Sequence, residues 1–189
     1  MTGTVAPPIY QLKITLAGVR PPVWRRLRVP SSINLKNLHQ ILQVALGWTD
    51  SHLHAFEVAG QTYGTPHSEY PNATRNEARV RLNEVLLKEK DSMLYEYDFG
   101  DGWEHKVVLE KIIPSTPDLS APSCIAGARA CPPEDCGGVG GYEEFLEAIR
   151  DPFHPEHEAM LEWIGGDFDP KYFDLDEVND ELAVRVRGL

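Results

Sequence analysis

The chain has 189 residues, 42% of them hydrophobic and 25% charged, a composition typical of one globular domain over residues 1–189 and not of a disordered chain. No stretch reaches the roughly 18 uninterrupted apolar residues of a membrane span, and the first ten residues lack the features of a signal peptide, so we expect a cytoplasmic protein. The net charge of −11 disfavours a general nucleic-acid binder, because phosphate contacts need a positive surface.

Two short alternating segments open the predicted fold. Residues 10–16 and 23–29 alternate apolar with polar side chains, as half-buried strands do. Gly18 to Pro22 predicts the turn between them, and Pro30 ends the second strand because it offers no N–H to a ladder. We therefore expect an antiparallel hairpin.

A helix is predicted next, over residues 35–46, because apolar residues recur there at helical spacing. Ser32 or Asn34 could supply its N-cap, and Gly47 stands where a left-handed residue ends many helices. This segment has the amphipathic pattern of a helix that covers a sheet.

The middle of the chain predicts two more hairpins. The first pairs residues 54–58 with 62–64. Residues 65–78 are polar and irregular, and residues 81–90 predict a short helix. The second pairs residues 93–99 with 103–113 around Gly100-Asp101-Gly102, a typical tight-turn sequence.

Helices dominate the C-terminal third of the pattern. Residues 114–141 hold five prolines and five glycines without periodicity and predict a long loop, either mobile or anchored. Helices are predicted over 142–149, over 155–164 with Pro155 at the first position, and over 174–182 with Asp174 as cap. The predicted class is α+β: an antiparallel sheet of hairpins covered by amphipathic helices that concentrate in the last third.

Several unusual motifs now stand in one order along the chain. They are Tyr10-Gln11-Leu12-Lys13-Ile14, Pro21-Pro22-Val23-Trp24-Arg25-Arg26, Gly47-Trp48, His52-Leu53-His54-Ala55-Phe56, Tyr95-Glu96-Tyr97-Asp98-Phe99-Gly100-Asp101-Gly102-Trp103-Glu104-His105, Ala130-Cys131-Pro132-Pro133-Glu134-Asp135-Cys136-Gly137-Gly138 and Phe168-Asp169-Pro170. From about residue 10 to residue 182 the chain resembles the plasmid pRiA4b ORF-3-like family. The resemblance implies a bacterial or archaeal α+β domain associated with plasmids and mobile elements, and it implies no catalytic mechanism.

Three cysteines lie close together in the long loop. Cys124, Cys131 and Cys136, with His154 or His157 downstream, could form a Cys₃His site that suits zinc and anchors the loop. The spacing has no C-x-x-C pair, so three reduced thiols that pack as small apolar groups are the favoured alternative. No cofactor is required by these motifs, and zinc or another divalent metal ion is the one they would suit.

Residues 132–138, Pro-Pro-Glu-Asp-Cys-Gly-Gly, combine stiff prolines, two acids and two glycines that permit close approach of a ligand or another backbone. Glu134 and Asp135 could serve as oxygen ligands or acid–base groups. The favoured alternative is a rigid loop in which Asp135 caps neighbouring N–H groups.

A third set of candidates lies on the predicted strands. His52 and His54 are two residues apart and would share one face, while Asp98 and Asp101 flank the hairpin turn that leads through Trp103 to His105. If these strands are neighbours, the side chains form a metal site or an acid–base pocket. The alternative is a turn aspartate and ordinary polar histidines among aromatics. We expect this strand, the hairpin and residues 132–138 to share one hollow.

A basic strip near the N-terminus departs from the overall charge. Residues 1–50 carry six Lys or Arg and one acid, a net charge of +5, which leaves −16 for the rest of the chain. The strip consists of Arg20, Arg25, Arg26 and Arg28. We favour a solvated strand face, or pairing with the chain's own acids, over nucleic-acid contact.

Three functions remain open, in descending order. The first is a binding domain whose aromatic- and acid-lined concave surface receives a protein or small-molecule ligand. The second is a metal-dependent enzyme, most plausibly hydrolytic. The third is a nucleic-acid accessory protein that uses the basic strip. The sequence favours binding over catalysis because no complete catalytic set is present.

Overall fold

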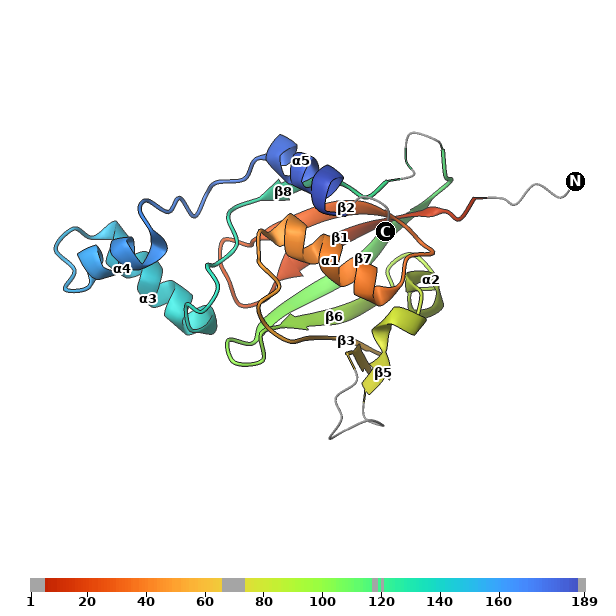
Figure 1. Ribbon diagram of the computed structural model, residues 1–189, viewed down its shortest axis with the longest axis horizontal. Helices are drawn as coiled ribbons and strands as arrows, with labels where there is room; N and C mark the ends of the chain where they lie inside the picture. The colour runs from red at the N-terminus through yellow and green to blue at the C-terminus, as the bar shows by residue number, and fades with distance from the viewer. Residues whose placement is uncertain (1–5, 66–73, 117–118, 120, 187–189) are drawn as a thin grey trace, which may run out of the picture.

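The computed structural model describes residues 6–65, 74–116, 119 and 121–186. Their centre is one eight-stranded sheet with the strand order β5-β4-β3-β6-β7-β1-β2-β8 (Figure 1). The strands are β1 (Ile9–Leu16), β2 (Trp24–Pro30), β3 (His54–Val58), β4 (Gln61–Gly64), β5 (Thr74–Asn76), β6 (Ser92–Tyr97), β7 (Trp103–Ile113) and β8 (Ser123–Ala128). Every pairing is antiparallel except that of β4 with β5, which confirms the predicted α+β class.

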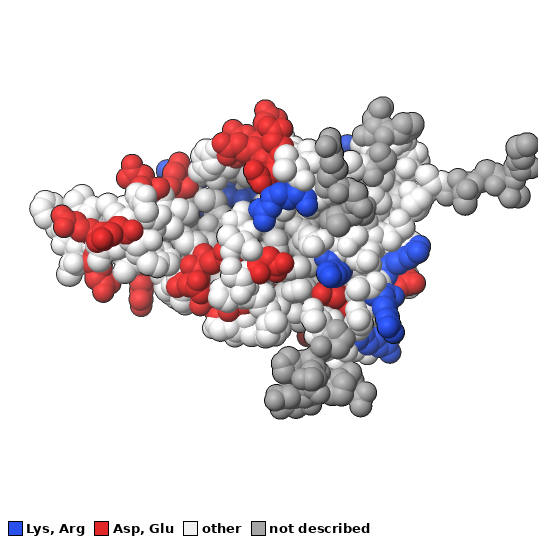
Figure 2. Space-filling view, in the orientation of Figure 1, with Lys and Arg blue, Asp and Glu red and all other residues white. Residues whose placement is uncertain are grey.

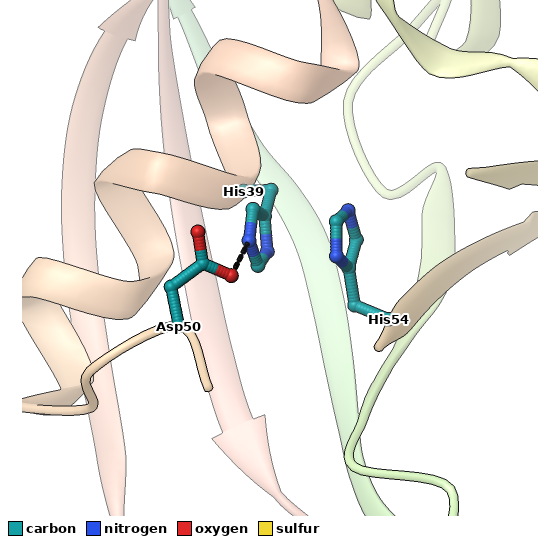
Figure 3. Close-up of side chains that lie close together, drawn as sticks. All are labelled: His39, Asp50 and His54. Atoms are coloured by element: carbon teal, nitrogen blue, oxygen red, sulfur yellow. Dashed lines mark hydrogen bonds and ion pairs between the residues drawn. The ribbon is translucent and has the colours of Figure 1, made fainter. Parts of the chain in front are cut away.

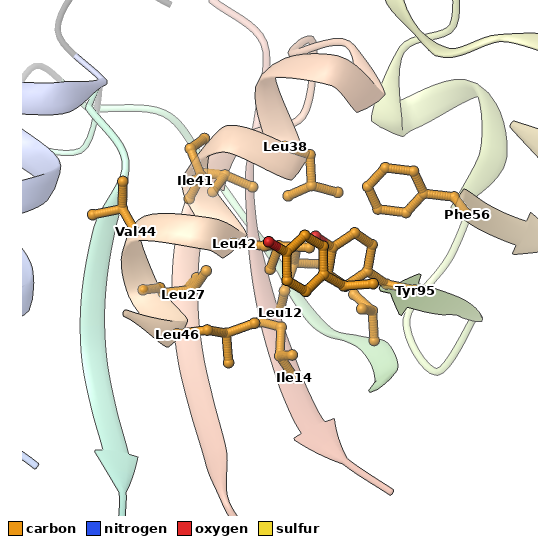
Figure 4. Packing of buried hydrophobic residues seen from close by; sticks show 14 of the residues in the cluster. Leu12, Ile14, Leu27, Leu38, Ile41, Leu42, Val44, Leu46, Phe56 and Tyr95 are labelled. Atoms are coloured by element: carbon orange, nitrogen blue, oxygen red, sulfur yellow. The ribbon is translucent and has the colours of Figure 1, made fainter. Parts of the chain in front are cut away.

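One face of the sheet carries the hydrophobic core. Helix α1 (Leu35–Leu46) lies across this face, and Leu38, Ile41 and Leu42 are fully buried against it (Figures 1 and 4). Asn34, one of the two predicted caps, accepts a hydrogen bond from the Asn37 N–H, and Gly47 ends the helix at φ 83°. Because α1 covers the sheet centre, the side chains of its buried face can reach β3 and β6.

The opposite face of the sheet is polar. Arg26 on β2 makes two contacts with the Glu110 carboxylate on β7, at 2.6 and 2.9 Å. Gln11 on β1, between these strands, donates to the same carboxylate at 2.9 Å. Alternation along the strands therefore separates an apolar face from a face held by charged pairs.

The edge strand β8 is a correction to the predicted loop over residues 114–141. Glycine and alanine give this strand no alternating pattern, so its sequence looks like loop, yet it pairs with β2. Helix α5 (Leu175–Arg185) covers it, and the Asn179 side chain both accepts from the Cys124 N–H and donates to the Cys124 carbonyl, each at 2.9 Å. The side-chain amide occupies backbone groups that a further strand would otherwise use.

Other boundaries also differ from prediction. The short helix predicted over 81–90 is one turn, α2 (Leu82–Val85), and the irregular stretch 65–78 contains β5 and a 3₁₀ turn, η1 (Glu77–Arg79). Pro155 was predicted at the first helical position, but the helix begins at His157 with Glu156 as its N-cap, so Pro155 lies before the helix. These segments are short, and tertiary pairing, not local pattern, sets their limits.

Two C-terminal helices project from the body of the molecule. Helix α3 (Gly138–Arg150) begins four residues before the predicted start, and α4 (His157–Ile164) packs beside it (Figure 1). Helix α4 has no fully buried residue, and Phe153 in the connection is 94% exposed. No helix in the described ranges is long and apolar enough to cross a membrane.

One histidine among the described residues, His105, is fully buried in the core. His105 on β7 lies opposite Tyr95 on β6, and its Nδ1 is 3.2 Å from the Tyr95 carbonyl oxygen. Its Nε2 is buried without a hydrogen bond. Burial lowers the pKa of this imidazole to about 4, so the ring is neutral at physiological pH.

This histidine predicts a pH-dependent stability. Because the pKa is about 4 in the folded protein and roughly 6.5 when unfolded, the unfolded chain takes up the proton first as the pH falls. The free energy of unfolding should therefore decrease between about pH 6.5 and pH 4, by up to roughly 1.4 kcal/mol per pH unit from this group. Urea unfolding of the wild type and His105→Asn, which keeps a donor near the Tyr95 carbonyl, measures it. The variant should show a shallower slope, and equal slopes would contradict the assignment.

Candidate functional site

Three segments distant in sequence meet at His52. The His52 Nε2 lies 3.1 Å from Asp135 Oδ1 and 3.7 Å from Asp98 Oδ2. His52 comes from the loop before β3, Asp98 from the end of β6, and Asp135 from the Pro–Gly segment. We call these three residues the His52 centre. The structure therefore brings together the histidine segment, the aspartate hairpin and residues 132–138, as expected from the sequence.

The hairpin after β6 fixes the Asp98 carboxylate. Asp98 adopts φ 56°, and its Oδ1 accepts a hydrogen bond from the Gly100 N–H at 3.0 Å. This local turn leaves Oδ2 to face His52. The side chain is largely buried, so its orientation is set by the fold and not by solvent.

The glycines of the Pro–Gly segment allow another backbone to approach closely. A Cβ placed on Gly138 would lie 2.4 Å from the Asp101 carbonyl oxygen, and Gly138 itself has φ 69°. The Gly137 N–H donates to Asp101 Oδ2 at 3.1 Å. The backbone that comes close is therefore the hairpin, and Asp101 is the residue that joins the two segments.

Glu134 connects the same segment to β6 and to the loop after α1. One carboxylate oxygen accepts the hydroxyl proton of Tyr97, and the other accepts from the Thr49 N–H at 3.1 Å and from the Thr49 hydroxyl. The Tyr97 oxygen in turn accepts from the backbone N–H groups of Ser51 and His52, at 3.0 and 3.3 Å. Burial, and the neighbouring carboxylate, raise the Tyr97 pKa, so the phenol remains a donor.

A second histidine cluster lies beside the first (Figure 3). His39 on α1 and His54 on β3 stack with ring centroids 3.4 Å apart and planes 4° from parallel. His39 Nε2 is 2.7 Å from Asp50 Oδ1, and His54 Nε2 is 2.7 Å from the buried carboxylate of Glu77. His52 and His54 line the same small cavity of about 200 Å³, although His52 lies in the loop before β3 and the two do not share a strand face as expected.

Every ring nitrogen of His39 has a partner. Its Nδ1 lies 2.8 Å from the Tyr95 hydroxyl oxygen. That oxygen accepts a hydrogen bond from the Gln43 side-chain amide at 2.9 Å, so the hydroxyl proton is available to be donated to His39 Nδ1. His39 then carries its own proton on Nε2, toward Asp50. Burial lowers the His39 pKa, the stacked His54 lowers it further, and Asp50 and Glu77 act in the opposite direction. The network keeps this ring neutral.

Parallel stacking also decides which cluster can hold a metal ion. Potential ligand atoms of His39, Asp50 and His54 lie within 4.8 Å of one another, as do those of the His52 centre. A metal ion lies in the plane of each imidazole ring that binds it. Two parallel stacked rings have no position in common that lies in both ring planes. As arranged, the stacked pair cannot donate to one ion.

Two residues predicted to line the hollow are instead part of the core. Trp103 and His105 are both buried, and Trp48 lies against them, with centroids 6.2 and 5.3 Å away. The Trp48 indole N–H donates to the Pro132 carbonyl at 2.9 Å, so this aromatic layer supports the site from beneath.

The cysteines do not gather. Cys124 is buried on β8, Cys131 Sγ lies 3.9 Å from the Arg25 guanidinium, and Cys136 is half-buried near Asp101. Burial raises the pKa of all three thiols, to about 11 for Cys131 and about 12 for Cys136. His157 and His154 make their contacts with the chain around α4, at the Ala148 carbonyl and the Glu156 N–H. Within the described ranges, these five side chains supply no group of three adjacent ligand atoms.

Two arginines of the basic strip are used internally. The buried Arg25 donates to the carbonyls of Ala45 and Ala128, at 2.8 and 3.1 Å. Arg26 pairs with Glu110. Arg28 is half-buried and Arg20 is exposed, so about half of the strip's charge remains at the surface.

An acidic and aromatic groove adjoins the site on the side of α3 and α4. It has a volume of about 260 Å³ and is lined by Asp135, Cys136, Gly141, Glu144, Phe145, Glu156, Met160 and Trp163. Asp135 belongs both to this groove and to the His52 centre. The groove was not predicted residue by residue, because its walls come from three separate segments.

Sequence reasoning also missed His39, Asp50 and Glu77, and it expected Tyr97 in the core or pocket wall without a role for its hydroxyl. One signal was present for His39: it stands four residues after Leu35, on the apolar face of α1, where a polar side chain requires a buried partner. Asp50, Glu77 and Tyr97 offered no comparable signal, since their roles depend on the packing of β3 and β6 against α1.

The close contact at Gly138 gives a testable prediction. Gly138→Ala must displace the Asp101 carbonyl and adopt a strained φ, so we expect a loss of at least about 2 kcal/mol in the free energy of unfolding. Gly140→Ala is the matched control, because a Cβ there meets no atom within 4 Å and alanine favours the helix. Urea unfolding compares the two. Equal stability of both variants would show that the contact does not hold the hairpin to the loop.

Comparison with known proteins places this geometry in a family. The chain is 40% identical over 182 residues to the uncharacterized protein y4hQ of Sinorhizobium fredii (strain NBRC 101917 / NGR234), covering 94% of this chain and 93% of that protein. It is similar to the crystal structure of MM3350, a protein of unknown function from Methanosarcina mazei Go1, with a TM-score of 0.82 and 39% identity over 93% of this chain and 98% of that one. The model of the plasmid pRiA4b ORF-3-like protein family matches residues 8–177, and the chain belongs to this family.

Proposed function

We propose that the domain is a protein-interaction module that binds a basic segment of a partner protein, with one Arg or Lys side chain seated in the acidic and aromatic groove. The observation that carries the proposal is the lining of the groove. Three carboxylates, of Asp135, Glu144 and Glu156, surround apolar side chains, and no Lys or Arg is among the described residues that line it.

This lining suits a long cationic side chain. The alkyl part of Arg or Lys packs on apolar surface while its charged end stays near water or a carboxylate. Phe145, Met160 and Trp163 supply the apolar surface, and the Trp163 ring stands edge-on to Phe145 with centroids 5.6 Å apart. Tryptophan is the aromatic residue that attracts a cation most strongly through its ring face.

The surrounding charge favours the same partner. Residues 138–165, which span α3 and α4, contain seven acids and one Arg, a net charge of −6. Figure 2 shows acidic side chains over this end of the molecule. Such a field attracts a basic segment from solution and speeds its association. It repels phosphate, so nucleic acid does not suit this groove.

The test uses fluorescent peptides of alternating Gly and Arg, with matched peptides in which neutral citrulline replaces each Arg. We expect the Arg peptide to bind, more weakly at higher salt, and the citrulline peptide not to bind. Glu144→Gln/Glu156→Gln should weaken binding by about tenfold at most, because each exposed charge pair contributes up to roughly 1 kcal/mol. Fluorescence anisotropy measures both.

Glu158→Gln/Glu162→Gln is the control. It removes the same amount of negative charge near α4, but neither residue lines the groove. It should bind nearly as the wild type does. Equal losses in the two double variants, or tight binding of the citrulline peptide, would contradict a specific cation site.

A further inference from the structure

The His52 centre has the donor set and spacing of a metal site, and it shares Asp135 with the groove. We propose that His52, Asp98 and Asp135 bind one divalent first-row transition metal ion, with zinc as the reference ion. Their ligand atoms, one imidazole nitrogen and two carboxylate oxygens, lie within 4.8 Å of one another. They come from three segments, so the ion would join the histidine loop, the hairpin and the Pro–Gly loop.

The distances are those of ligands that share one ion. Ligands about 2.0–2.1 Å from a tetrahedral zinc ion are roughly 3.3 Å apart. The two separations from His52 Nε2, 3.1 and 3.7 Å, lie on either side of that value. A charge-assisted hydrogen bond would instead be about 2.7–2.9 Å long, as the contacts of the neighbouring stacked pair are.

The atoms concerned are also free of other partners. His52 Nε2 is buried and makes no hydrogen bond, since Asp135 lies near it but out of line with the N–H direction. Asp98 uses Oδ1 for the hairpin N–H groups and leaves Oδ2 toward His52. Two carboxylates so close together repel each other, and a divalent cation removes that repulsion.

The surroundings supply both rigidity and access. The Tyr97 hydroxyl holds the backbone N–H of His52, and Glu134 holds Tyr97. Such outer contacts fix the orientation of metal ligands. The Asp135 side chain is 71% exposed, which leaves an entry path and room for water molecules in the remaining coordination positions.

The mixed donor set selects the class of ion. Imidazole favours zinc and its neighbours in the first transition row, whereas magnesium and calcium prefer oxygen ligands alone. No thiol belongs to the centre. The ion is therefore expected to have nitrogen and oxygen ligands only, in contrast to the cysteine site considered from the sequence.

Isothermal titration of untagged, chelator-treated protein with Zn²⁺ tests the proposal. We expect one ion per chain, and a loss of affinity of at least about tenfold in His52→Ala and in Asp98→Asn, because losing a ligand costs no less than losing an outer contact. Magnesium should not compete. Circular dichroism verifies that each variant is folded.

Two further measurements separate this site from the alternatives. His154→Ala should bind zinc as the wild type does, and the Co²⁺-loaded protein should lack a thiolate charge-transfer band. No zinc binding by the wild type, zinc binding that survives His52→Ala, or a thiolate band would overturn the proposal. Glu144→Gln/Glu156→Gln should leave zinc binding unchanged, so failure of the groove proposal and failure of this one are distinguishable.

Discussion

One phenolic oxygen connects two of the loops on which the site depends, and its residue leads directly into the third. The Tyr97 hydroxyl donates to Glu134 and accepts from the N–H groups of Ser51 and His52, which is the full capacity of a hydroxyl group. Its ring stacks on Trp48, with centroids 4.9 Å apart. Tyr97 is on β6, between β3 and β7 in the sheet order, so the sheet helps to position these loops, in addition to the direct contact between Gly137 and Asp101. Loss of this hydroxyl would leave one oxygen of the half-buried Glu134 carboxylate and two backbone N–H groups without this partner, while Thr49 would still donate to the other Glu134 oxygen.

The two histidine clusters differ in how far their polar groups are satisfied. His39 and His54 have short contacts with carboxylates, and the stack is closed to a shared ligand. His52 has two carboxylates nearby and no hydrogen bond at Nε2. His105 Nε2 is also buried without a hydrogen bond, but it lies in the core, whereas His52 Nε2 faces two carboxylate oxygens. The polar groups of the first cluster are paired within the fold, and this difference is what directs the metal proposal to the second.

The sequence predicted those parts of the structure that local pattern controls. The hairpins, helix α1 with Asn34 and Gly47 at its ends, and the meeting of the histidine, hairpin and Pro–Gly segments were all expected. Strand β8 was not, because Gly127 and the alanines beside it give no alternation and the strand exists through its pairing with β2. Trp103 and His105 of β7 were predicted to line the hollow. Strand alternation instead points both side chains into the core.

The roles of single side chains depended on contacts that no local pattern encodes. His39 reaches its partners only because α1 crosses β3 and β6, and Glu77 meets His54 through the 3₁₀ turn after β5. The same residue types could serve as surface charges elsewhere. The sequence could therefore identify candidate residues, and the topology of the sheet determines which of them come together.

Asp135 lies on the boundary between the His52 centre and the acidic groove, and this shared position has a thermodynamic consequence. A positive charge that engages the carboxylate from one side reduces the negative potential that it offers on the other. Occupancy of either region must then weaken occupancy of the second, and linkage requires the penalty to be equal in both directions. One exposed carboxylate would thus make the two regions antagonistic without any change in backbone conformation.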